Sequence, residues 1–266
     1  MNNSQCALQP LLLAAMILMP VSAQATPPGK ASLESVVPAD PDAHSGAPAS
    51  WARPVVDDAN YANFTLDRLE HRGYDGGEGY LWEAEGWYGN DRDKFWWKTE
   101  GEGDWRTGQT ESAEFQGLYD RMLDDFWDLQ VGLRHDADPH PSRTYGVIGL
   151  QGLAPYGIDT EASLFVSERG DTSARLEFEH EWLLTQRWML SPRFEINASA
   201  DRVADYELGK GITSTEAGLR LSYDVTRQFS PYVGMSWENV HGETRDMRTR
   251  EEADRLSLVV GLSAWY

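Results

Sequence analysis

The feature that most constrains this chain is an alternation of apolar and polar side chains that recurs from residue 60 to Tyr266. In residues 126–134, Trp127, Leu129, Val131 and Leu133 share one face, and Asp, Gln, Gly and Arg residues occupy the other. Residues 173–182, 216–225 and 256–266 repeat the pattern. Because successive side chains of a strand point to opposite faces, this periodicity predicts β-strands.

The polar faces of these segments carry charges, which limits the folds that can hold them. Arg175, Glu177, Glu179 and Glu181, for example, fall on one face. Unpaired charges of this kind would be costly in the dry core of a β-sandwich. Sandwich strands are also usually about five or six residues long, whereas strands of about ten residues match tilted membrane strands. We therefore predict an all-β fold, a transmembrane antiparallel β-barrel with a polar lumen.

The spacing of the segments predicts roughly twelve strands. An even number places both chain ends on the periplasmic side. Short links are expected at 89–91, 122–124, 154–156, 184–186 and 227–229, and longer ones at 100–110, 136–142, 201–212 and 241–253. The strands are predicted to begin near Ala62, Gly79, Lys94, Glu111, Asp125, Arg143, Gly157, Thr172, Arg187, Thr213, Ser230 and Asp254.

Aromatic side chains gather beside the predicted short links. Trp87 and Trp96 flank the first link, Trp182 and Trp188 flank another, and Tyr266 ends the chain. This placement is typical of the aromatic girdles that barrels present to the membrane interface. Ordinary core aromatics are the alternative interpretation.

The first 59 residues differ in character from the rest. Residues 1–25 are predicted to be a secretory signal peptide, because an apolar run from Leu11 to Met19 precedes the small-residue site Ala23-Gln24-Ala25. Residues 26–59 are rich in Pro, Ala, Asp and Ser, which predicts a disordered periplasmic segment. Residues 60–266 are then one domain, a β-barrel in the bacterial outer membrane.

The charge balance narrows the classes of partner. The chain has 23 basic and 43 acidic residues, a net charge of -20. Nucleic-acid binding needs a basic surface, so the sequence argues against it and is compatible with cations. The one cysteine, Cys6, lies in the predicted signal peptide, which excludes disulfides and thiolate metal sites from the mature chain.

Several runs, in their order and spacing, resemble the copper resistance protein B family. They include residues 86–89 (GWYG), 97–102 (WKTEGE), 113–119 (AEFQGLY), 126–134 (FWDLQVGLR), 149–156 (GLQGLAPY), 165–171 (FVSERGD), 184–187 (LTQR) and 231–238 (PYVGMSWE). The resemblance extends from residue 59 to residue 266. It implies an outer-membrane β-barrel for copper tolerance that binds copper ions or passes them across the membrane, with periplasmic copper-resistance proteins as partners.

The chain departs from that family before the barrel. Members often carry a Met- and His-rich segment there, whereas residues 26–60 contain one histidine, His44, and no methionine. Copper sequestration by this segment is therefore not expected here.

One short stretch could bind copper itself. Copper(II) prefers imidazole and carboxylate ligands, whereas copper(I) prefers sulfur. His135, Asp136, Asp138 and His140 form the densest local set of such groups, in a predicted outer loop. We predict weak copper(II) capture there, and a solvated polar loop is the alternative.

Carboxylates on the polar faces are the second candidate. Alternation predicts that seven of them face the lumen: Glu83, Glu85, Glu100, Asp128, Glu177, Glu179 and Glu195. They could form a cation path, or they could pair with arginines and lysines across a plugged lumen, because small barrels are often filled by side chains.

Enzyme signatures are absent from the sequence, which has no G-x-S-x-G, H-E-x-x-H or phosphate-binding loop. We therefore expect a protein without catalytic activity. Two alternatives to a copper protein remain: a general small-solute or cation channel, and an outer-membrane lipid-modifying enzyme that uses His180.

Overall fold

Antiparallel strands make up nearly all of the computed structural model, which describes residues 59–247 and 253–266. The short β9 continues β8 beyond Glu181, and both pair with β10, so the barrel has twelve strands. The predicted signal peptide and the segment predicted to be disordered lie outside the described residues, apart from Ala59. The strands are β1 (Tyr61–Tyr74), β2 (Gly77–Gly89), β3 (Asp93–Asp104), β4 (Gln109–Met122), β5 (Trp127–Asp138), β6 (Arg143–Ala154), β7 (Ile158–Ser167), β8 (Thr172–His180), β9 (Trp182–Leu183), β10 (Trp188–Ser199), β11 (Gly211–Tyr223), β12 (Phe229–Val240) and β13 (Asp254–Trp265).

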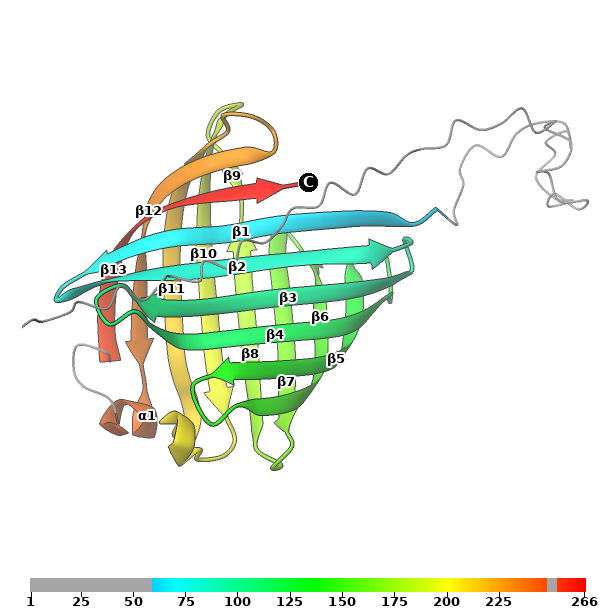
Figure 1. The fold of residues 1–266 in the computed structure, drawn as a ribbon. Coiled ribbons are helices and arrows are strands. Elements are labelled where there is room, and N and C mark those ends of the chain that lie inside the picture. The colour runs from blue at the N-terminus through cyan, green and yellow to red at the C-terminus, as the bar shows by residue number, and fades with distance from the viewer. Residues whose placement is uncertain (1–58, 248–252) are drawn as a thin grey trace, which may run out of the picture. The chain divides into compact units, whose positions relative to one another are not determined.

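The sheet closes on itself between its first and last strands, which lie side by side in Figure 1. β1 pairs with β13 from Thr65 opposite Trp265 to Tyr74 opposite Ser257. Closure leaves no strand edge unpaired, and a bilayer requires this because it offers backbone groups no water. The predicted antiparallel barrel is confirmed.

The two faces of the wall differ as the alternation predicts. On β13, the outward Leu258 and Val260 are 68% and 60% exposed, whereas the inward Ser257 and Val259 are almost fully buried. A continuous apolar exterior of this kind is stable only against lipid. In the described part of the chain, no helix is long and apolar enough to span a membrane.

A bulge in β1 changes which of its residues face the lumen. Its register shifts after Leu66 against both β2 and β13. Asp67 and Arg68, although consecutive, both line the lumen as a result. Such an insertion lets a strand re-aim a side chain without losing its place in the sheet.

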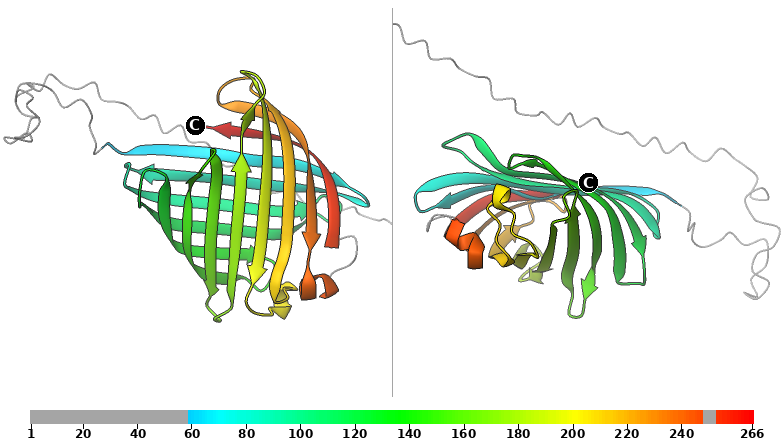
Figure 2. Two further views of the ribbon diagram at one scale, coloured as in Figure 1. Left: turned by 180° about the vertical axis from the view of Figure 1, so that it is seen from behind. Right: turned by 90° about the horizontal axis from the view of Figure 1, so that it is seen from below.

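The links at the end of the barrel opposite Tyr61 and Tyr266 pack on one another. The β10–β11 link carries the short helix η2 (Ala204–Tyr206), and the β12–β13 link carries α1 (Gly242–Met247). Both lie at the same end of the barrel in Figures 1 and 2. The Gly209 amide donates to Thr244 Oγ1 at 2.8 Å, and the Tyr206 hydroxyl donates to the Pro141 carbonyl at 2.7 Å. Three links thus form one cover.

Two local predictions need correction. The link predicted at 100–110 is shorter, because Asp104 ends β3 and accepts the backbone N–H groups of Arg106 and Thr107, which closes a tight turn. Trp87 and Trp96 do not join an outer girdle. They pack inside the lumen, where the Trp96 Nε1–H donates to Glu85 at 3.1 Å.

The outward position of Val260, near the middle of β13, provides a test of lipid contact. We expect Val260→Arg to lower the free energy of unfolding by about 2–4 kcal/mol, because an arginine near the bilayer centre is costly. Denaturant titration of the barrel in lipid vesicles, followed by tryptophan fluorescence, measures the difference. Leu123→Arg is the matched control, because Leu123 is equally exposed but lies in a link. Equal losses at both positions would contradict a lipid-facing wall.

Candidate functional site

The lumen contains two cavities, each with acidic walls. The inner cavity, at the end where the chain terminates, has a volume of about 910 Å³. Thirteen carboxylates and five basic side chains line it. The outer cavity lies beneath the cover formed by the links and has a volume of about 760 Å³. Its walls carry thirteen carboxylates and three arginines.

The seven predicted lumen carboxylates all lie on these walls. Five line the inner cavity, namely Glu83, Glu85, Asp128, Glu177 and Glu179. Glu100 and Glu195 line the outer cavity.

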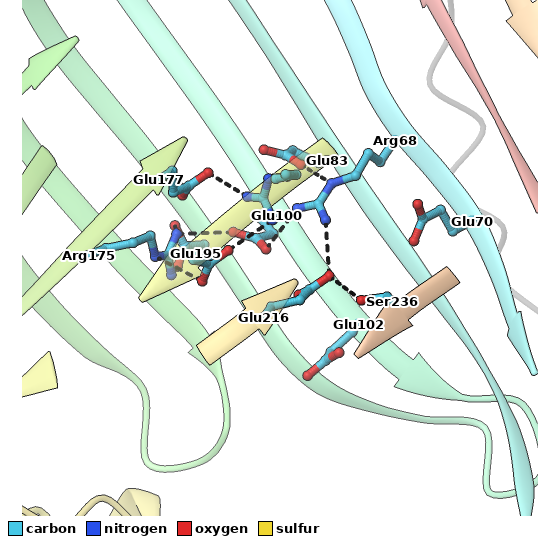
Figure 3. A network of polar contacts seen from close by, with 12 residues as sticks. Arg68, Glu70, Glu83, Glu100, Glu102, Arg175, Glu177, Glu195, Glu216 and Ser236 are labelled. Carbon is cyan, nitrogen blue, oxygen red and sulfur yellow. Dashed lines mark hydrogen bonds and ion pairs between the residues drawn. The ribbon is translucent and has the colours of Figure 1, made fainter. Parts of the chain in front are cut away.

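Between the cavities lies a cross-lumen layer of ion pairs, shown in Figure 3. We call it the ion-pair layer. Its cations are Arg68, Arg175 and Arg193, and its anions are Glu83, Glu100, Glu114, Glu177, Glu195 and Glu216.

Arg175 shows how the ion-pair layer crosses the lumen. From β8, its guanidinium reaches Glu100 on β3 at 3.1 Å and Glu114 on β4 at 2.9 Å. β8 is not a neighbour of β3 or β4 in the sheet, so these contacts join opposite walls. Side chains that span the lumen in this way brace the barrel from within.

Arg68 lies at the centre of the ion-pair layer, with only 5% of its side chain exposed. Its Nε–H donates to Glu83 on β2. Its terminal nitrogens lie 3.6 Å from Glu100 on β3 and 3.8 Å from Glu216 on β11. One arginine therefore connects three other strands.

A second cluster surrounds Glu70, whose side chain is fully buried. Arg72 and Arg220 donate to it at 2.8 and 2.6 Å, and the Tyr232 hydroxyl donates at 3.2 Å. A buried carboxylate is stable only when charge and hydrogen bonds compensate for its lost hydration, and these three groups provide both.

The inward role of β1 was not predicted from the sequence. Arg68, Glu70 and Arg72 were not among the predicted lumen residues, although their alternation with Leu69 and His71 is a usable signal. The bulge obscures this alternation, because counting residues from the start of β1 places the three charged side chains on the lipid face.

The structure brings together only two of the four predicted copper ligands. β5 extends to Asp138, so His135 lies on the exposed outer face and Asp136 is buried in the lumen, 2.7 Å from Arg134. Asp138 and His140 are in contact, with Oδ1 and Nδ1 2.8 Å apart. His135 instead contacts Thr144 Oγ1 at 3.0 Å.

The described residues offer few other copper ligands. Neither cavity has a histidine on its described walls, and Met122 and Met189 supply the inner cavity with sulfur. No group of three or more His, Cys, Asp or Glu side chains among the described residues is arranged to hold a metal ion.

Comparison with known proteins agrees with this architecture. Residues 60–266 match the family model described as Copper resistance protein B precursor. Copper resistance protein B of Escherichia coli is 39% identical over 203 residues, covering 76% of this chain and 68% of that protein. The Copper resistance protein B homolog of Pseudomonas syringae pv. tomato is 35% identical over 251 residues, covering 93% and 84%.

Among solved structures, the NanC porin has a similar fold. Its TM-score is 0.51 at 16% sequence identity, over 76% of this chain and 98% of that chain. This similarity concerns the fold alone and agrees with a barrel located in the outer membrane. Together with the match over residues 60–266, it leads to one conclusion: the chain belongs to the copper resistance protein B family of outer-membrane β-barrels.

Proposed function

We propose that this barrel contributes to copper resistance by binding copper ions in its lumen or passing them across the outer membrane. The observation that carries the proposal is the excess of carboxylates over basic groups on the walls of both cavities. Family membership supplies the link to copper.

The electrostatics of the lumen favour cations. A cleft of one charge sign with low-dielectric walls concentrates counter-ions and repels ions of its own sign. The lipid-covered wall supplies the low dielectric, and carboxylate oxygens are acceptable ligands for copper(II). Copper(II) would therefore be enriched in both cavities, whereas anions would be excluded.

The Asp138–His140 pair is the proposed capture point on the outer side. Its histidine side chain is 80% exposed, so an incoming ion can reach it. At the other end of the barrel, the inner cavity opens beside the periplasmic links and includes Asp124 and Asp125 on its wall. Periplasmic copper-resistance proteins are the proposed recipients or donors there.

A general cation channel is the second candidate. Because no histidine lines the described walls of either cavity, the lumen ligands are mainly hard oxygens that do not discriminate copper from other divalent cations. In this interpretation, selectivity would reside outside the barrel.

We propose that the protein is not an enzyme. His180, the residue on which a lipid-modifying activity would depend, has its Nδ1 2.6 Å from the carbonyl oxygen of Gly157. A catalytic histidine needs a nucleophile in hydrogen-bond reach, and among the described residues no serine, threonine or cysteine side chain is hydrogen-bonded to His180. Purified protein is expected to leave phospholipid and lipopolysaccharide unaltered.

Deletion of the gene tests the copper assignment. We expect the deletion strain to lose growth at copper concentrations that the parent tolerates, with unchanged tolerance to zinc, nickel and cobalt, and complementation to restore it. Growth curves across a series of each metal measure this. Equal sensitivity to all four metals would favour the general cation channel.

The loop histidines are tested by copper(II) binding to purified barrel. We expect His135→Ala combined with His140→Ala to weaken binding, and His140→Ala to account for most of the loss, because His140 alone contacts a carboxylate of the set. Isothermal titration calorimetry gives the affinities, and His71→Ala is the matched control on the outer wall. Unchanged affinity in the double variant would exclude the loop site.

A further inference from the structure

Arg68 is one of the arginines through which the ion-pair layer separates the two cavities. The inner and outer cavities share no lining residue. Arg68 lines the inner cavity, whereas two of its partners, Glu100 and Glu216, line the outer one. The Arg68 guanidinium therefore lies between the two cavities. Arg193 also lies there, but it is 3.0 Å from Glu195 of the outer cavity, so Arg68 is the more loosely held of the two.

The three guanidinium nitrogen atoms of Arg68 differ in whether they form a hydrogen bond. Its Nε–H forms a hydrogen bond with Glu83, whereas Nη1 and Nη2 have no hydrogen-bond partner among the described residues. Their distances of 3.8 and 3.6 Å to Glu216 and Glu100 exceed hydrogen-bond length. The guanidinium is thus hydrogen-bonded to β2, and only longer-range attraction holds it to Glu100 and Glu216.

The partner carboxylates keep other contacts when Arg68 is taken away. Glu216 accepts from Ser236 Oγ at 2.6 Å and lies 3.3 Å from Arg72. Glu100 lies 3.1 Å from Arg175. Both carboxylates would therefore stay in position while Arg68 moves.

We propose that Arg68 is the gate of the lumen and that cations open it by exchange. A cation in the outer cavity takes the place of the Arg68 terminal nitrogens on Glu100 and Glu216, so no carboxylate is left buried without a counter-charge. The guanidinium swings into the inner cavity while bound to Glu83. Asp67 and Glu179, which form no ion pair with described residues, receive it there.

This proposal rests on the proposed function in one respect: it takes the lumen as the path that cations follow through the barrel. It predicts that the positive charge at residue 68 itself, rather than the barrel diameter, limits ion flow. Charge can be removed and restored at this point, because Cys6 is the one cysteine of the chain.

The test uses Arg68→Cys in a Cys6→Ser background, reconstituted in planar lipid bilayers in potassium chloride. We expect its single-channel conductance to exceed that of the Cys6→Ser parent severalfold. Treatment with 2-aminoethyl methanethiosulfonate, which attaches a positively charged group to the thiol, should reduce it again. Methyl methanethiosulfonate, which attaches a neutral group, should leave it high.

Arg255→Cys in the same background is the matched control. Arg255 lines the outer cavity and pairs with Glu238 at 2.8 Å, away from the ion-pair layer. Its conductance should equal that of the parent before and after both reagents. The proposal is overturned if folded Arg68→Cys conducts like the parent, if the two reagents act alike on it, or if Arg255→Cys gives the same increase.

Folding of each variant is checked by its migration in sodium dodecyl sulfate gels before and after heating. Should Arg68→Cys fail to fold, Arg68→Gln replaces it, because glutamine removes the positive charge and keeps a polar side chain that can hydrogen-bond to Glu83. Its conductance should exceed that of the parent, and an unchanged value would overturn the gate. Since potassium carries the current, a negative result here leaves the copper-binding measurements unaffected, and loss of copper binding leaves the gate standing.

Discussion

A charged side chain inside the barrel has to be balanced by an opposite charge in the same lumen. Glu70 illustrates the constraint, because its carboxylate is fully buried and is balanced by Arg72 and Arg220. Arg68 and Arg175 follow the same rule on a larger scale, since each is surrounded by carboxylates from several strands. Removal of one partner from such a pair is strongly destabilising, because the charge that stays behind is uncompensated. This demand organises the interior into a layer with a cavity on either side.

The same constraint connects the closed sheet to the proposed function. Closure of the sheet provides hydrogen-bond partners for the backbone groups of the wall in lipid. It also turns every second side chain toward the lumen. The inward set has more carboxylates than basic side chains, so pairing of opposite charges leaves an acidic surplus on both cavity walls. That surplus attracts cations, whereas the layer itself separates the two sides. The proposed binding and restricted passage of a metal cation would therefore arise from one arrangement of charges.

Sequence reasoning predicted the fold because alternation is local information. Arg143, Thr172 and Asp254 were predicted to begin strands and do begin β6, β8 and β13. The ion-pair layer could not be predicted in this way, because Arg175 and Glu100 are 75 positions apart and meet only after the sheet has curved round and closed. The bulge in β1 added a second obstacle, since it reverses the inward parity at Asp67 and Arg68.

The predicted copper loop shows how the length of a strand decides which side chains can meet. Strand β5 was expected to end before Asp136, which would have left His135 and Asp136 free to converge with Asp138 and His140. The pairing of Asp136 with Arg143 and of His135 with Thr144 extends the strand instead, so that these two side chains point to opposite faces. Trp96, which was expected in the aromatic girdle, lies in the lumen instead, where its Nε1–H donates to Glu85.

The central claim is that a surplus of carboxylates makes the lumen a compartment for cations. The reversal potential of the purified wild-type barrel in a planar bilayer, under a gradient of potassium chloride, tests it most directly. We expect a potential displaced toward the equilibrium potential of potassium. A potential displaced toward that of chloride would contradict it.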